Sequence, residues 1–183
     1  DETPDYKLKA NNFSSDDELY SLPVVISKDL SDVLNDQLSM RSISPKKEAL
    51  CKYLIGTIEN DGYLRREPID VIDDLAFGLG ISVEEPELLE ALSIIQSMDP
   101  PGVGARDLRE CLLLQIDRKP QGDQRDLIKK IVSDFFEELS KRHFDKLKAS
   151  LNVEEKDLKN AIFEISRLSP KPGNNVSFSG QNF

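Results

Sequence analysis

A rigid corner between two helices is the feature that most constrains how this chain folds. Residues 96–115 read QSMDPPGVGARDLRECLLLQ. The two consecutive prolines end any preceding helix, because a proline lacks the backbone N–H and its ring clashes with the turn before it. Gly102 and Gly104 then permit a tight reversal, and an amphipathic pattern starts at once. The segment therefore predicts a helix, a corner and a second helix.

Composition favours helices over strands in the rest of the chain. Hydrophobic residues make up 38% of the 183 residues and charged residues 32%, while Trp is absent and the aromatic share is 7%. These values are typical of a soluble helical protein rather than of a β-sandwich. We expect an all-α fold, a helical bundle of two subdomains of which the second is a three-helix unit of helix-turn-helix type.

The net charge of −10 and the isoelectric point near 4.7 limit the partners of the chain. A polyanion is repelled by phosphate, so poor binding to nucleic acid and better binding to a basic protein surface are expected. No apolar run approaches the ~20 residues that cross a bilayer, so we expect no membrane segment. Asp1 is not an initiator Met, which suggests a fragment of a longer protein.

Apolar residues at helical spacing, with caps and breakers, predict eight helices. The third is expected to place Ile72, Leu75, Ala76 and Leu79 on one face. Cys51 and Cys111 fall in helical patterns and favour a reduced pair, with a disulfide left open. The expected helices are Ser27 to Met40, Ser44 to Asn60, Pro68 to Leu79, a helix capped by Ser82 and Glu85 that runs to the corner, Leu108 to Ile116, Asp123 to Leu139, Phe144 to Ala149, and Asn152 to Leu168.

Loop composition predicts the division of the chain. Residues 1–26 lack periodicity and carry an acidic run, so they are expected to form a mostly disordered linker. The Pro- and Gly-containing stretch after residue 118 is the best boundary. We therefore expect a first helical subdomain over 27–118 and a second, three-helix subdomain over 119–173.

Two segments, 81–100 and 151–170, align without a gap at an offset of 70 residues. Both segments have a capping residue, an acidic first turn, an apolar stripe and a proline that ends the helix. This recurrence suggests a helix-turn-helix used twice. Convergence of two capped amphipathic helices is the alternative. Both second helices begin with Glu-Glu, which stabilises the helix dipole but repels DNA.

Catalytic patterns are missing from the sequence. His143 is the only histidine and has no neighbouring cysteine, so a zinc site is not expected. Gly102 and Gly104 have the spacing of part of a glycine-rich loop, but no strand precedes them and no third glycine follows. We expect no enzyme, no metal and no cofactor.

Three stretches resemble one family. They are IENDGYL at 58–64, the corner motif at 96–115 and LSPKPG at 168–173. In their order and spacing they are similar to the core-binding region of sigma-54, the activator-dependent bacterial sigma factor. The resemblance covers about residues 27–173.

The resemblance implies a cytoplasmic module that docks on the β and β′ subunits of bacterial core RNA polymerase for transcription initiation. Promoter DNA would be bound only through regions of the family that have no counterpart in this sequence. Residues 174–183 would then be a tail that leads towards an absent DNA-binding domain.

The motifs supply eleven candidate residues. Gly62 is expected in a turn, with Tyr63 and Leu64 in the core. Arg106 and Asp107 are expected either as interface charges or as a cap for the following helix. Two further charges, Arg109 and Glu110, are expected to contact the partner, and four residues, Asp99, Pro100, Gly102 and Val103, to set the angle between the helices.

Two rival functions share these features. A transcriptional DNA-binding module would use the repeated helix-turn-helix, and a helical adaptor would use the same fold for an unrelated protein. In the favoured interpretation, apolar anchors supply affinity and the acidic surface steers the encounter with basic polymerase surfaces.

Overall fold

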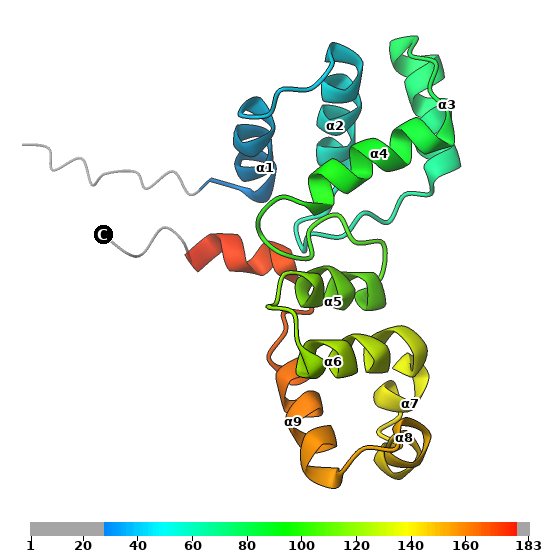
Figure 1. Ribbon diagram of the computed structural model, residues 1–183. Coiled ribbons are helices and arrows are strands. Elements are labelled where there is room, and N and C mark those ends of the chain that lie inside the picture. The colour runs from blue at the N-terminus through cyan, green and yellow to red at the C-terminus, as the bar shows by residue number, and fades with distance from the viewer. Residues whose placement is uncertain (1–27, 179–183) are drawn as a thin grey trace, which may run out of the picture.

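The computed structural model describes residues 28–178, in which every regular element is helical (Figure 1). The all-α prediction is confirmed for this range, whereas the predicted linker over 1–26 and the end of the predicted tail lie outside it. The elements are α1 Leu30–Ser39, α2 Pro45–Thr57, α3 Pro68–Leu79, α4 Glu85–Gln96, α5 Leu108–Asp117, α6 Asp123–Asp134, α7 Phe136–Ser140, α8 Phe144–Leu151, α9 Glu155–Ser166 and the 3₁₀ helix η1 Pro172–Phe178.

Local sequence accounts for most helix ends. Ser44 caps α2 by accepting the N–H of Lys47, and Pro45 occupies the first helical position, as predicted. Gly80 ends α3 in the left-handed conformation at φ 64°. The predicted start of α1 is wrong, because the helix begins at Leu30 and Asp29 is its cap.

The predicted caps of α4 and α9 are also wrong, and both true starts lie later in the chain. In α4 the backbone N–H of Glu84 donates to Oε2 of Glu87 at 3.0 Å, so the reciprocal pair lies two residues beyond the predicted one. Glu154 precedes α9, while Asn152 lies at φ 50° and ends α8. Each turn needs a left-handed residue followed by extended ones before the next helix begins.

The predicted long helix from Asp123 is broken in two. Gly122, not Asp123, precedes α6, and the break falls at Phe135, with φ −124° and ψ 30°. Phe135 and Phe136 are both half-buried against the same hydrophobic cluster. Successive side chains of a continuous helix point about 100° apart, so the break is what lets both rings reach that cluster.

Two large hydrophobic clusters hold the helices together. The first lies among α1 to α4 and the second among α5, α6, α8 and α9, and Figure 1 shows these groups at opposite ends of an elongated molecule. No charged side chain is buried in the described range. The largest fully buried members are Leu34, Leu38, Leu50, Leu54, Ile55, Leu75, Ile95 and Met98 in the first cluster and Ile116, Ile128, Ile131 and Leu147 in the second.

Helix α5 belongs with the second cluster, although the sequence placed the boundary after it. It packs against α6 and contributes Leu112 and Ile116 to the second cluster. The division into subdomains at residues 27–118 and 119–173 stays a prediction.

The internal repeat is visible in the packing. Helices α4 and α9 begin 70 residues apart and bury equivalent residues, with Leu88 matching Leu158 and Ile95 matching Ile165. Each follows a helix that ends on a left-handed residue, Gly80 before α4 and Asn152 before α9. The predicted recurrence of helix, turn and helix is confirmed.

The buried face of α3 differs from the predicted one. Val71 and Leu75 are buried in the first cluster, whereas Ala76 is exposed and Leu79 is 59% exposed. Because α3 lies at the edge of the helical group and packs against α4, only a narrow stripe is covered.

We expect Ile131→Ala to lower the free energy of unfolding by about 2–5 kcal/mol, because the side chain is fully buried in the second cluster and its removal leaves a cavity. Urea denaturation followed by circular dichroism measures the change. The neighbouring exposed Lys130 provides a matched control, since Lys130→Ala should change stability by no more than about 0.5 kcal/mol. Equal effects of the two substitutions would contradict the assigned packing.

Candidate functional site

The three sequence motifs meet in space between the two hydrophobic clusters. We call this region the junction and define it by residues 60–64, 102–105, 111–115 and 168–173. Tyr63, Ala105 and Cys111 form a small buried cluster there, with Leu114 half-buried beside them. The junction thus consists of four stretches of chain, two of them from the corner motif.

Backbone hydrogen bonds join the first motif to the proline corner. The N–H of Gly104 donates to the carbonyl of Gly62, and the N–H of Leu64 donates to the carbonyl of Ala105, both at 2.9 Å. Val103, which immediately precedes these two positions, is fully buried. These contacts hold the corner against the turn that follows α2.

The last motif approaches the first so closely that side chains are excluded. The N–H of Gly173 donates to the carbonyl of Asp61 at 2.9 Å, and a Cβ on Gly173 would overlap the carbonyl oxygen of Asn60. A Cβ on Gly62 would lie 2.7 Å from Cγ of Pro172, and Gly62 has φ 96°. Glycine is needed at both positions, at Gly62 for conformation as well as space.

Tyr63 joins the first and last motifs through its hydroxyl group, which donates to the carbonyl of Pro170 at 2.6 Å. The ring is buried, and burial, followed by contact with Cys111, raises the pKa of Tyr63 far above its ordinary value. The phenol therefore remains a hydrogen-bond donor throughout the physiological range of pH.

Gln115 joins the end of the corner motif to the last motif. Its side-chain amide donates to the carbonyl of Ser169 at 2.7 Å and accepts from the N–H of Ser169 at 2.8 Å. Both backbone groups of Ser169 are thus satisfied by one side chain. The side-chain amide of Gln115 thus makes the pair of backbone hydrogen bonds that a neighbouring strand would make in a β-sheet.

Cys111 fills the space between the corner and the last motif. Its Sγ lies 3.7 Å from the carbonyl oxygen of Ser169, and a Cβ on Gly102, which has φ 96°, would lie 2.8 Å from that sulfur. Burial raises the pKa of Cys111. Cys51 is buried in the first cluster, where burial raises its pKa to about 11. Both thiols are free, so the disulfide left open by the sequence does not form.

Asp99 fixes the corner to the first cluster and to the end of α5. Its backbone and the side chain of Gln37 exchange two hydrogen bonds, of 2.7 and 2.8 Å, and its carboxylate pairs with Arg118 at 2.5 Å. Pro100 is half-buried after it. The expectation that Asp99 and Pro100 help to set the angle between helices is consistent with these contacts.

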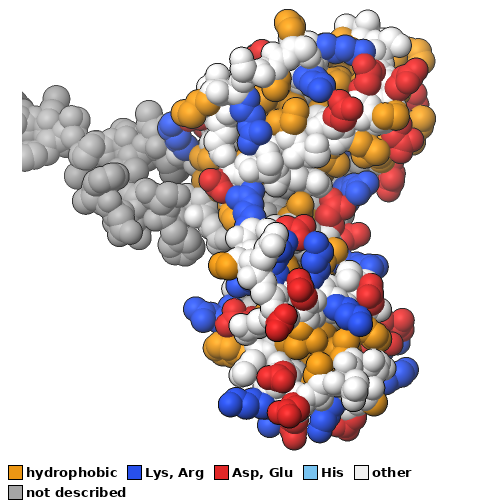
Figure 2. All heavy atoms as spheres, viewed as in Figure 1, with side chains coloured by type: hydrophobic (Ala, Val, Ile, Leu, Met, Phe, Trp, Pro, Cys, Tyr) orange, Lys and Arg blue, Asp and Glu red, His pale blue; other side chains and the backbone are white. Residues whose placement is uncertain are grey.

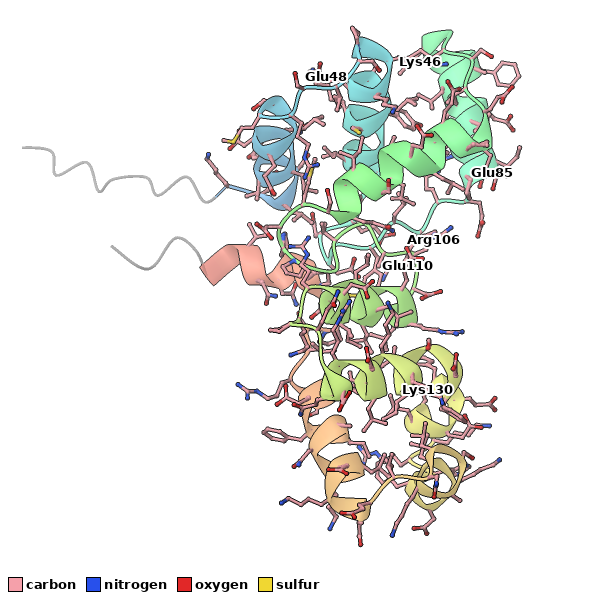
Figure 3. All side chains as sticks on the ribbon, in the orientation of Figure 1. Lys46, Glu48, Glu85, Arg106, Glu110 and Lys130 are labelled. Carbon is pink, nitrogen blue, oxygen red and sulfur yellow. The ribbon has the colours of Figure 1, made fainter. Side chains whose placement is uncertain are left out.

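The motif charges lie around the start of α5 (Figure 3). Arg106 pairs with Glu110 at 2.8 Å, and Glu110 also accepts from the side chain of Gln96 at 2.6 Å. Asp107 caps α5 by accepting the N–H of Glu110 at 2.8 Å, so of the two roles left open for Asp107 the structure shows the cap. Arg109 is exposed and donates to the backbone carbonyl of Ser133 in α6.

Sequence reasoning found the turn and core residues but missed their partners. Gln115 closes the corner motif and could have been singled out as the only amide of α5 on its inward side. Ser169 and Pro170 lie within a quoted motif but were not selected. Nothing in the sequence pointed to Gln37, because it is one of several polar residues in α1.

The described residues show no group of three metal-ligating side chains, and His143 immediately precedes α8. None of the helices in residues 28–178 is long and apolar enough to cross a membrane.

Comparison with known proteins gives one consistent family. The family model described as "Sigma-54 factor, core binding domain" matches residues 23–182. The RNA polymerase sigma-54 factor of Acidithiobacillus ferridurans is 36% identical over 152 residues, which is 82% of this chain and 31% of that protein. Sigma-54 factor 1 of Bradyrhizobium diazoefficiens is 36% identical over 161 residues, 87% of this chain and 31% of its own length. The factor of Azotobacter vinelandii is 30% identical over 178 residues, 95% of this chain and 35% of its own length. The chain thus spans about a third of the length of these curated relatives.

We expect Gly173→Ala to open the junction, because the added methyl group has no room beside Asn60. The free energy of unfolding should fall by about 1–3 kcal/mol, as for other overpacked sites. Labelling by a thiol reagent under native conditions should become faster at Cys111, whereas Cys51, in the first cluster, serves as an internal reference that stays protected.

Gly56→Ala is the matched control for this substitution. Gly56 lies within α2 with nothing within 4 Å of its added Cβ, so alanine should preserve or raise stability through its better helix propensity, worth about 1 kcal/mol. Unchanged Cys111 labelling in Gly173→Ala would refute the close approach.

Proposed function

The chain belongs to the sigma-54 factor family, and from this membership we propose that it binds bacterial core RNA polymerase. The observation that carries the proposal is the match of the core-binding-domain model over residues 23–182. The convergence of the three motifs at one junction supports it, because those motifs are the ones on which the resemblance rests. The proposed role is non-catalytic docking, within the cytoplasm where bacterial transcription takes place.

The shape of the chain suits docking across more than one polymerase subunit. Two hydrophobic clusters lie at opposite ends of the molecule, and the junction between them is held by backbone and side-chain hydrogen bonds (Figure 1). We propose that the β and β′ subunits are contacted by different ends. We also propose two subdomains, 27–118 and 119–173. Helix α5 would connect them, because its residues lie both in the small cluster at the junction and in the second cluster.

Three motif charges at the start of α5, Arg106, Arg109 and Glu110, are the proposed contact residues. Arg106 is an exposed half of its pair with Glu110, and Arg109 is exposed beside them at the start of α5. The remaining motif residues are buried or hold the corner and the start of α5 in place, so their proposed role is to shape the docking surface rather than to touch the partner.

Charge argues against the DNA-binding alternative. The second helix of each repeated unit begins with acidic side chains, Glu84, Glu85 and Glu87 at α4 and Glu154 and Glu155 at α9. In a DNA-reading helix-turn-helix, that turn meets phosphates and base edges. Carboxylates at these positions would be repelled by the phosphate backbone.

We expect the purified 183-residue chain to co-elute with bacterial core RNA polymerase on a sizing column at low salt. The complex should weaken at moderate salt, because charge complementarity steers association and salt screens it. The general sigma factor of the same bacterium should compete the chain away. Separate elution at both salt concentrations would contradict the proposal.

Promoter DNA supplies the control that separates the alternatives. We expect no gel shift of promoter DNA by the chain at low salt. A shift would favour the DNA-binding module, and binding to neither DNA nor polymerase would favour a helical adaptor for another protein.

A further inference from the structure

Helix α3 exposes large apolar side chains that the fold does not use. Phe77 is 90% exposed, Ile69 61% and Leu79 59%. Phe77 is the most exposed large hydrophobic residue in the described range. Leaving a phenyl ring almost wholly in water is unfavourable, since burying such a side chain is worth about 1.5–3 kcal/mol.

Ile69 and Phe77 lie along one side of the helix, whereas Leu79 lies on the side of the buried Leu75, four residues after it. Ile69, Asp73 and Phe77 are spaced four residues apart, so they form one stripe on the helix surface. The opposite face carries Val71 and Leu75, which are buried in the first cluster. The outer stripe can therefore change without disturbing the core.

The charge beside the stripe has one sign. Helix α3 contains three aspartates and no lysine or arginine. Asp74 is engaged on the inner side, where it pairs with Arg66 at 2.6 Å and accepts from the hydroxyl of Tyr53 at 2.9 Å. Asp70 and Asp73 are exposed, and neither forms an ion pair with any residue of 28–178. The face thus combines an apolar anchor with uncompensated negative charge.

Its position leaves this face open. Helix α3 packs against α4 and lies at the edge of the molecule farthest from α8 and α9 (Figure 1). Figure 2 shows hydrophobic and acidic side chains together along that edge. Phe163, the exposed aromatic residue of α9, differs because the guanidinium of Arg167 lies over its ring at 5.7 Å.

We propose that the outer stripe of α3, with Phe77 as its anchor, docks into an apolar pocket bordered by lysine or arginine side chains on core RNA polymerase. This inference rests on the proposed polymerase binding and assigns one of its surfaces. An aromatic side chain that enters a desolvated pocket is typical of the residues that dominate binding energy. Asp70 and Asp73 then face the basic rim, where opposite charge raises the association rate and fixes orientation.

The test compares the affinity of the unchanged chain and of Phe77→Ala for core polymerase, by titration of the fluorescently labelled 183-residue chain. Phe77→Ala should weaken binding by about tenfold or more, as expected for an aromatic anchor. Its melting temperature should stay unchanged because the ring is exposed. Asp73→Lys should slow association and reduce its dependence on salt.

Met40→Ala is the control, since Met40 is 83% exposed immediately after α1, a different helix of the same helical group. It should bind as the unchanged chain does. Equal affinity of Phe77→Ala and the unchanged chain would overturn the docking surface while leaving polymerase binding intact. Failure of the unchanged chain to bind would overturn both proposals. A dimer on the sizing column that Phe77→Ala converts to monomer would assign the stripe to a second copy of the chain and overturn the inference.

Discussion

Close packing of backbone against backbone at the junction is the constraint on which the rest of the structure depends. Gly173 lies against the turn at Asn60 and Asp61 with no space for a side chain, and Gly62 faces Pro172 in the same way. The two hydrophobic clusters do not merge, so their relative placement depends on this contact and on the hydrogen bonds around it. The glycines allow the backbone segments to approach, and the side chains of Tyr63 and Gln115 then hold them together by hydrogen bonds to Pro170 and Ser169.

Much of the fold follows from local sequence signals. The cap at Ser44 and the left-handed Gly80 depend on residues close together in the chain, and the structure has them where the pattern predicts. The cap at Asp107 is one of the two roles that the pattern left open, and α4 ends at Gln96, before the double proline. Errors arose where tertiary packing decides. The break at Phe135 serves two aromatic rings, and the buried stripe of α3 is narrow because that helix lies at the edge of the first helical group and packs mainly against α4.

The candidate site was less predictable than the fold. The motifs identified the right segments, but the bond from Tyr63 to Pro170 joins residues 107 positions apart, and no periodicity reports such a contact. The two hydrogen bonds between Gln37 and Asp99 join residues 62 positions apart, and the sequence pattern gave no sign of them either. Phe77 had a weak signal, since it falls outside the apolar face predicted for its helix. A single sequence indicates which residues are apolar, but which apolar residues remain uncovered depends on the arrangement of the helices.

The absence of buried charge within residues 28–178 separates two properties that often change together. Every ion pair there involves partly or largely exposed side chains, and such pairs add little to folding stability. Hydrophobic burial, which moderate salt barely affects, holds each helical group together. The ionic strength of the surroundings can therefore adjust how strongly the acidic surface attracts a basic one while the folded shape stays constant. Salt can therefore tune the attraction of this molecule to a basic partner separately from the stability of its fold.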